Sequence, residues 1–366
     1  MIFFSIGLPG RFADWCDTAI GLLAGRSGGT VTVGEWPRLP DMFGYNMISS
    51  VLDEVALRLI GSSATHLVMG ARQPDERLCA ALAETSARFI VALDDPRFAA
   101  ADILVATNAE PRVVARAVAN SCPLVMRYAS LPGALTMYAD REGTDPAPAI
   151  AAMARHFGIE VDDAAVKGIV DDLAAAGHGG ALSRPDDEWS RRVPASAHNM
   201  LNGALAGYRE QIGGGDLGQI IWTRELFIAA GHSANLTDSL EASTGSPICP
   251  IIYGPYIHLP AGSWTARVVL GFSLEAAGHT FLVDAFSERQ LGSTSFQPER
   301  EGVYTVDINF SLDEPSGHGV EIRVWVWSEY ARGQLAFGHV ILRPLAMRQP
   351  DVIAGSQHDF RTVLDL

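Results

Sequence analysis

The spacing of hydrophobic positions changes about halfway along the chain. In the first half, short apolar runs predict strands at residues 2–6, 30–36, 66–70, 88–95 and 123–128. Apolar residues that recur every three or four positions predict helices at residues 11–23, 48–60, 75–87, 111–119, 147–157 and 163–175. Strands that alternate with helices predict a parallel sheet covered by helices on both faces.

The second half has a different pattern. Residues 177–196 are rich in Gly, Ser and Pro, which is typical of a linker, and residues 198–212 have helical spacing. From residue 219 onward, long segments alternate between apolar and polar positions and are joined by turn residues, which predicts an antiparallel β-sandwich or jelly roll. The chain therefore divides into an α/β domain, a linker with one helix, a β-sandwich domain and a polar tail, at residues 1–176, 177–217, 218–346 and 347–366.

Composition excludes several classes of protein. The net charge of −15 disfavours nucleic acid as a partner, because such binding depends on basic side chains that neutralise phosphates. The chain has no run of about 20 apolar residues, so we expect no membrane span. The apolar N-terminus lacks a basic region before it and is interpreted as a core strand, not a signal peptide. Four scattered cysteines without a CxxC pair predict buried thiols, no metal site and a cytoplasmic location.

Four stretches occur in the order of the motifs of the P-loop sulfotransferases. They are a strand, glycine loop and helix ("FFSIGLPGRFADWCDTAI", 3–20), a strand end with Asp-Pro-Arg ("FIVALDDPRFAAADIL", 89–104), an Arg-Tyr strand end ("VMRYASL", 125–131) and a closing helix pair ("MARHFGIEVDDAAVKGIVDDL", 153–173). The first 175 residues thus resemble that family. The resemblance implies a sulfotransferase-like parallel sheet that binds 3′-phosphoadenosine 5′-phosphosulfate.

The resemblance also implies positions for site residues. Gly10 and Arg11 would belong to the loop that wraps the 5′-phosphosulfate, and Arg97 would lie near the 3′-phosphate. Glu35, after the second strand, would be the catalytic base. A literal Arg-Ser-Gly-Gly-Thr at residues 26–30 precedes a strand, whereas a phosphate loop follows a strand and opens a helix, so we interpret it as a turn.

Several cofactor positions depart from the family pattern. The Ser-Gly-Thr of the loop is replaced by Phe-Ala-Asp at residues 12–14, and Asp17 adds a second carboxylate. The position of an expected Arg is taken by Asp94, and the Glu-Asp of the Arg-Tyr strand end is replaced by Ala-Ser at residues 129–130. Carboxylates repel a bound dianion by more than the roughly 1 kcal/mol that a helix N-terminus returns. We therefore expect a fold that no longer holds the nucleotide and uses no cofactor.

The second half resembles the β-sandwich modules attached to bacterial glycan-biosynthesis proteins, which are similar in shape to carbohydrate-binding modules. The motifs are "GPYIHLP" at 254–260 and "FGHVIL" at 337–342. Alternation along residues 321–329 places Ile322 and Val324 in the core and Arg323, Trp325 and Trp327 on the opposite face. Aromatic rings stack on sugars and charged groups bond to hydroxyls, so these residues, with Tyr256, are candidates for carbohydrate binding.

Three hypotheses follow. The favoured one is a non-catalytic sulfotransferase-like protein that recognises a glycan or serves as a scaffold for the bacterial machinery of polysaccharide synthesis or export. The second is an active transferase with an altered donor site, in which Arg11 binds phosphate and Glu35 is the base. The third is a structural protein that forms a homo-oligomer through Trp325 and Trp327, since exposed aromatic patches also mark interfaces.

Overall fold

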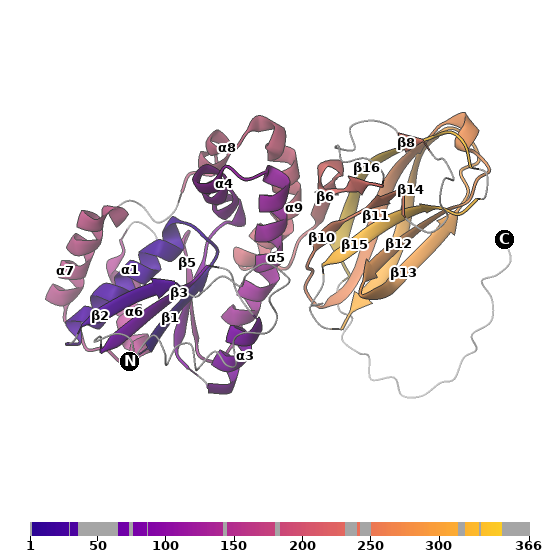
Figure 1. The fold of residues 1–366 in the computed structure, drawn as a ribbon. Helices are drawn as coiled ribbons and strands as arrows, with labels where there is room; N and C mark the ends of the chain where they lie inside the picture. Colours follow the sequence, from indigo (N-terminus) through magenta and orange to yellow (C-terminus); the bar gives the residue numbers. More distant parts are fainter. Residues whose placement is uncertain are drawn as a thin grey trace, which may run out of the picture.

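The computed structural model describes residues 2–28, 30–35, 65–72, 76–85, 87–141, 145–179, 184–230, 240–241, 250–313, 319–328 and 331–345. The predicted helix at 48–60 and the predicted tail at 347–366 lie outside these residues. Figure 1 shows a helix-covered sheet formed by the first half of the chain and a sandwich of strands formed by the second half. The predicted fold class is confirmed.

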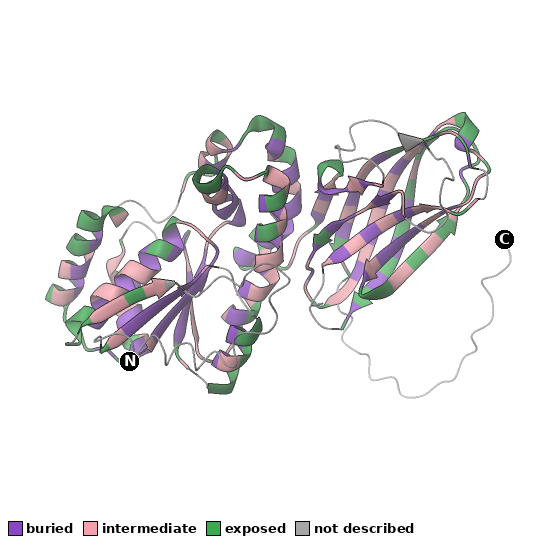
Figure 2. Cartoon of the chain, in the orientation of Figure 1, coloured by how far each residue is buried: buried purple, intermediate pink, exposed green. Residues whose placement is uncertain are grey.

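The first half contains a five-stranded, fully parallel sheet in the order β2-β3-β1-β4-β5. The strands are β1 (Ile2–Gly7), β2 (Val31–Glu35), β3 (His66–Ala71), β4 (Phe89–Leu93) and β5 (Ala134–Tyr138). The central strands β1, β3 and β4 are almost entirely buried, as their continuous apolar runs predict. Figure 2 shows the buried strands enclosed by helices whose outer faces are exposed.

Helices cover both faces of this sheet. They are α1 (Arg11–Arg26), α3 (Glu76–Thr85), α4 (Pro96–Thr107), α5 (Pro111–Ala129), α6 (Ala147–Phe157), α7 (Asp163–Leu173), followed by the π-turn η1 (Ala174–His178), then α8 (Glu188–Arg192), the 3-10 turn η2 (Ala195–Ala197) and α9 (His198–Ile212). One apolar cluster joins α1, α6 and α7 to one face, and a second joins α3, α4, α5 and α9 to the other. The helices therefore form the two outer layers that alternating strands and helices predict.

The strand predicted at residues 123–128 is wrong. These residues form the last part of α5, and the strand β5 follows it at Ala134–Tyr138. The buried positions of this helix include Val118, Cys122, Val125 and Tyr128, which are three or four residues apart and lie on one helical face. A short apolar run cannot be distinguished from a buried helical segment by its periodicity, which explains the error. The Arg-Tyr motif consequently lies at a helix end.

The second half is a sandwich of two antiparallel sheets. One has the order β13-β12-β15-β9-β7, with β10 paired to β15, and the other has the order β14-β11-β16-β6, with β8 paired to β16. The strands are β6 (Ile220–Thr223), β7 (Ile228–Ala229), β8 (Leu240–Glu241), β9 (Ile252–Tyr253), β10 (Pro255–Ile257), β11 (Gly262–Phe272), β12 (Phe281–Ser287), β13 (Arg289–Phe296), β14 (Gly302–Leu312), β15 (Val320–Val326) and β16 (Gln334–Pro344), with 3-10 turns η3 (Arg224–Leu226) and η4 (Leu274–Ala276).

The two halves are joined by direct contacts of α5 and α9 with the sandwich. The Tyr208 hydroxyl on α9 donates to the His258 carbonyl at 3.0 Å, and the His258 amide donates to Asn120 Oδ1 on α5 at 2.7 Å. A β-carbon on Gly207 would lie 2.6 Å from the Gly218 carbonyl oxygen, so only glycine permits this approach. The segment 177–217, predicted as a linker with one helix, contains two α-helices, α8 and α9. The buried face of α9 packs on β6. The four-part division of the chain stays a prediction.

Candidate functional site

The glycine loop that links β1 to α1, residues 8–10, lies at the carboxyl edge of the parallel sheet. Strand β1 lies between β3 and β4 in the sheet. The next strand in the chain, β2, lies beyond β3 on one side of β1, whereas β4 and β5 lie on the other side. Ligands of open α/β sheets bind in the crevice outside the carboxyl ends of the strands at such a switch point. Gly10 and Arg11 are therefore at the predicted place, and Glu35 ends β2 at the same edge, two strands away from β1.

A carboxylate of the chain itself lies against this loop. A β-carbon on Gly10 would be 3.0 Å from Asp102 Oδ2, so Asp102 occupies the space next to the start of α1. Asp102 accepts hydrogen bonds from Arg184 Nη2 at 3.0 Å and Arg192 Nη1 at 2.5 Å. Arg11 is exposed, and its guanidinium lies 3.6 Å from a Glu188 carboxylate oxygen. Residues 184–192 thus place two arginines and a glutamate beside the loop, and each is paired with an opposite charge.

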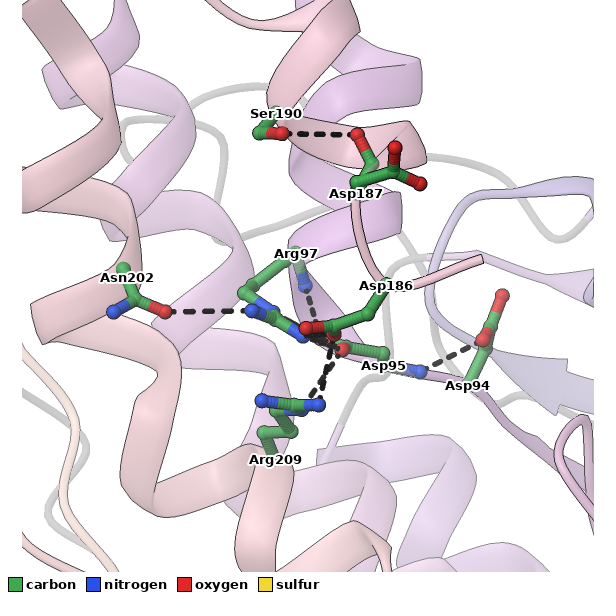
Figure 3. A network of polar contacts seen from close by, with 8 residues as sticks. All are labelled: Asp94, Asp95, Arg97, Asp186, Asp187, Ser190, Asn202 and Arg209. Carbon is green, nitrogen blue, oxygen red and sulfur yellow. Dashed lines mark hydrogen bonds and ion pairs between the residues drawn. The ribbon is translucent and has the colours of Figure 1, made fainter. Parts of the chain in front are cut away.

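Arg97 lies at the same edge of the sheet, but its guanidinium is paired with carboxylates of the chain. Its side chain is only 4% exposed and donates hydrogen bonds to both carboxylate oxygens of Asp95, from Nε to Oδ1 at 3.1 Å and from Nη2 to Oδ2 at 2.6 Å. It also donates to Asp186 at 2.5 Å and stacks over the Trp189 ring at 5.1 Å. Figure 3 shows Asp95 and Asp186 directed at Arg97, with Asn202 of α9 on the other side. Arg209 neutralises the same two carboxylates, so the cluster is internally balanced.

The local sequence explains how this cluster forms. Asp95 is the N-cap of α4, since its side chain accepts the Arg97 amide at 2.9 Å and Pro96 takes the first helical position. The same carboxylate also accepts hydrogen bonds from the guanidinium of Arg97. The family resemblance assigned Arg97 to phosphate binding, whereas its buried side chain here holds the start of α4 to α8 and α9.

Acidic side chains also surround the first turn of α1. Arg72, at the end of β3, bonds Asp14 at 3.2 Å and Asp17 at 2.5 Å. Burial raises the pKa of Asp17, and the neighbouring Arg72 acts in the opposite direction. The Asp17 carboxylate lies so close to Gly70 that no β-carbon would fit there. This part of the edge therefore holds an arginine that is already neutralised.

Asp94 is a candidate that the sequence did not reveal as functional. It follows β4 directly, accepts the Asp95 amide at 2.8 Å and points away from the Arg97 cluster in Figure 3. Burial raises its pKa to about 7, although Arg184 opposes the shift. A carboxylic acid that titrates near neutrality can transfer a proton in either direction. The only signal in the sequence is the pair Asp94-Asp95 before a proline, of which the second residue caps the helix.

These residues do not fit the 3′-phosphoadenosine 5′-phosphosulfate that the resemblance implies. The loop offers an exposed Arg11, the Asp102 carboxylate stands next to Gly10, and Arg97 is buried among carboxylates. Among the residues that the structure describes, no group of three or more His, Cys, Asp or Glu side chains is arranged to hold a metal ion. The described cysteines, Cys16, Cys79 and Cys122, are buried and none of them forms a disulfide.

The second candidate site is the outer surface of the sheet that contains β15. We call it the Trp325 face and define it by Asp284, Phe286, Arg323, Trp325 and Trp327. The predicted alternation holds, since Ile322 and Val324 are buried in the sandwich core. Arg323 and Trp325 lie on the opposite side of β15, and Trp327 follows the strand end with 64% of its surface exposed.

Asp284 on β12 organises this face. It lies opposite Arg323 in the sheet and accepts from it two hydrogen bonds of 2.9 and 2.5 Å. It also accepts the Trp325 indole N–H at 3.2 Å, which fixes the position of that ring. The Arg323 guanidinium lies 3.8 Å from the centre of the Phe286 ring. Sequence reasoning missed Asp284, because a residue 39 positions away becomes a partner only through the strand pairing.

Tyr256 lies at the other end of β15 from Trp327, next to α5. The Arg116 guanidinium lies 5.9 Å from the Tyr256 ring centre, and Asn120 donates to the Tyr256 carbonyl at 3.4 Å. Burial raises the pKa of the Tyr256 hydroxyl to about 12, and the Glu321 carboxylate contributes to that rise. At about 3.3 Å per residue, the length of β15 separates Tyr256 from Trp327 by about 20 Å. The structure therefore does not bring Tyr256 together with the two tryptophans.

Comparison with known proteins identifies similar folds for both halves. Neither a protein-family model nor a curated protein sequence matches the chain. The first half is similar to the mouse sulfotransferase SULT7A1 complexed with PAP, at 11% identity and a TM-score of 0.40 over 55% of this chain and 82% of that chain. The sandwich is similar to the xylan-binding module CBM15, at 12% identity and a TM-score of 0.25 over 35% of this chain and 98% of that module. It is also similar to the CBM36-1 domain of a multidomain xylanase from the hindgut metagenome of Trinervitermes trinervoides, at 10% identity and a TM-score of 0.23.

No helix in the described part of the chain has the length and apolar character needed to cross a membrane.

Proposed function

We propose that this protein recognises a glycan through its sandwich and that its sulfotransferase-like half is non-catalytic. In this proposal it serves as a glycan-recognition or scaffold subunit for bacterial polysaccharide synthesis or export, in the cytoplasm. The observation that carries the non-catalytic part is the Arg97 cluster. A basic side chain that would bind a phosphate is buried and bound to Asp95 and Asp186 instead.

The charges at the glycine loop support the same conclusion. A dianion placed at the start of α1 would meet the Asp102 carboxylate, which is already paired with Arg184 and Arg192. Breaking a buried ion pair by removing one partner costs about 3–5 kcal/mol. The attraction of a helix N-terminus for an anion is about 1 kcal/mol, which does not offset that cost. Nucleotide binding would therefore require rearrangement of residues 184–192.

Calorimetry tests the non-catalytic half of the proposal. The full chain is titrated with 3′-phosphoadenosine 5′-phosphate and with 3′-phosphoadenosine 5′-phosphosulfate, and we expect no binding tighter than about 1 mM, which corresponds to about 4 kcal/mol. The matched variant Arg11→Ala removes the exposed arginine that follows the loop at the start of α1 and should give the same result. Micromolar binding that Arg11→Ala weakens would refute the proposal.

The Trp325 face supports the glycan-binding half. A protein surface that exposes a tryptophan next to ordered polar groups has the composition of a sugar site, since rings stack on apolar sugar faces and polar groups set orientation. The Trp327 ring is exposed, and the Trp325 ring is held by Asp284. An oligomer interface is the competing explanation for the exposed ring. Light scattering of Trp327→Asp decides between them, because loss of an oligomer would favour the structural assembly hypothesis.

A second candidate function, a transferase with an altered donor, is favoured by Asp94. A carboxyl group with a pKa of about 7 is partly ionised near neutrality, and its carboxylate form is suited to accept a proton from an acceptor hydroxyl. Arg184 Nη1 beside it is buried and has no hydrogen-bond partner among the described residues. In this hypothesis Arg11 binds phosphate and Glu35 or Asp94 is the base.

The assay for this candidate uses 3′-phosphoadenosine 5′-phosphosulfate, ATP and UDP-glucose as donors and xylohexaose as acceptor. Turnover that is abolished in the double variant Arg11→Ala, Glu35→Ala would support the transferase with those assignments. Turnover that survives the double variant and disappears in Asp94→Asn would assign the base to Asp94. Absence of turnover with every donor would support the non-catalytic proposal.

A further inference from the structure

The charged groups of the Trp325 face cancel one another. The side chain of Asp284 is 2% exposed and that of Arg323 is 16% exposed, and the pair forms two parallel hydrogen bonds. Both carboxylate oxygens of Asp284 are therefore occupied, one of them also by the Trp325 indole. The guanidinium also lies over the Phe286 ring at 3.8 Å and over the Trp325 ring at 5.1 Å. The one arginine of β15 thus has no free charge to offer an anion.

The rest of this face adds negative charge. Glu321 lies on the same side of β15 as Arg323, two residues away, and it hydrogen-bonds to the Tyr256 hydroxyl. In the sheet, β13 contributes Ser293 opposite Asp284 and Ser295 opposite Leu282, both uncharged. A uronate or sulfate brought to this surface would meet no unpaired arginine on β15 and, at the Tyr256 end of the strand, the Glu321 carboxylate. The apolar face of a neutral sugar would instead meet the exposed Trp327 ring.

We infer that the Trp325 face binds a neutral glycan chain and discriminates against acidic and sulfated ones. This inference rests on the proposed glycan-recognition function and adds the class of ligand to it. Trp327 supplies the exposed stacking surface, and Trp325, about 7 Å along the strand direction, supplies a second, fixed ring. Asp284 is a positioning residue that cancels the charge of Arg323 and orients Trp325.

Calorimetry on the full chain provides the first test. The neutral probes are xylohexaose, cellohexaose and mannohexaose, and the acidic probes are hexagalacturonic acid and a chondroitin sulfate hexasaccharide. We expect a neutral probe to bind at least tenfold more tightly than either acidic probe. Its affinity should change less than twofold between 50 and 500 mM NaCl, because screening acts on charges.

Variants locate the binding and test the charge argument. Trp327→Ala should weaken the neutral probe at least tenfold, whereas the matched control Val303→Ala, which shortens an exposed apolar side chain on the other sheet, should not. Asp284→Asn frees the charge of Arg323 and should raise affinity for the acidic probes several-fold. Asp307→Asn is its control, because Asp307 forms the same two-bond pair with Arg267 on the opposite sheet.

The outcomes separate the inference from the function on which it rests. Equal or tighter binding of an acidic probe that depends on Trp327 would overturn the inference and leave glycan recognition intact. Failure of all five probes to bind the folded protein would overturn both. Unchanged acidic binding in Asp284→Asn, with the variant folded, would also overturn the inference, because the charge of Arg323 would then have no role in selectivity.

Discussion

Asp94 makes the stability of the folded chain depend on pH in a defined way. Its carboxyl has a folded-state pKa of about 7, against a usual value of 3.8, because burial disfavours the charged form. The folded protein therefore binds a proton that the unfolded chain has released at every pH between these two values. Stability contributed by this group is present below pH 3.8 and is lost as the pH rises toward 7.

The size of the effect follows from the shift. One pH unit corresponds to 1.36 kcal/mol, so a rise of about three units corresponds to about 4 kcal/mol. The substitution Asp94→Asn keeps an oxygen that can accept the Asp95 amide and removes the ionisable group. We therefore expect the variant to equal the natural chain in stability near pH 4 and to exceed it by up to about 4 kcal/mol near pH 8.

The assay is urea denaturation at half-unit steps from pH 4 to pH 8, followed by circular dichroism. The difference in the free energy of unfolding between the two proteins should grow by about 1.4 kcal/mol per unit and level off near pH 7. The control Asp172→Asn removes an exposed carboxylate that pairs with Arg26, which should change stability by less than about 1 kcal/mol. Parallel profiles for Asp94→Asn and the natural chain would refute the raised folded-state pKa of Asp94.

Two further predictions concern packing and charge, and both are measured by urea denaturation at pH 7. Arg97→Ala should destabilise the fold by about 1–3 kcal/mol, because it removes the buried donor to Asp95 and Asp186 while Arg209 still pairs with both carboxylates. Arg127→Ala, at an exposed pair with Glu76, should cost less than about 1 kcal/mol, and equal effects would contradict the buried role of Arg97. Gly207→Ala should lower the free energy of unfolding by about 1–3 kcal/mol, because its β-carbon would meet a backbone oxygen. The control Gly21→Ala in α1, where a β-carbon has room, should be neutral or stabilising. A Gly207→Ala variant as stable as the natural chain would show that α9 can shift on the sandwich.

Much of the fold could be predicted from the sequence because the spacing of hydrophobic residues is regular within each half of the chain. Buried parallel strands appear as continuous apolar runs, and sandwich strands alternate with a period of two. The prediction failed where the pattern was ambiguous. Pro123 and the apolar residues after it looked like a strand, yet they continue α5. Strand β13 was missed because Leu291 and Phe296 are its only large apolar residues, as expected for an edge strand in which no residue is buried.

The site was less predictable because charge pairing depends on contacts that are distant in sequence. The position of the glycine loop, residues 8–10, follows from the order of strand and helix and is where the resemblance placed it. That Arg97 would be neutralised by Asp186, 89 residues later, cannot be read from either local segment. The outward direction of Arg323 followed from alternation, but its pairing with Asp284 required the register of β12 and β15.

The same physical arrangement recurs in both candidate sites and constrains what each can bind. In the first half, the buried Arg97 is bound to Asp95 and to the exposed Asp186, and in the sandwich, Arg323 is bound to Asp284. Each arginine that the sequence offers to an anionic ligand is thus already matched by a carboxylate. An arginine that bridges two segments of the chain stabilises their packing. If Arg323 turned to an anionic ligand, the buried Asp284 carboxylate would lose the cation that compensates its charge. The chain has 42 acidic and 27 basic side chains, so that its net charge is −15. This pairing of charges supports the proposal that the protein binds uncharged ligands that stack on rings, and Trp327 is the residue on which that proposal is most directly tested.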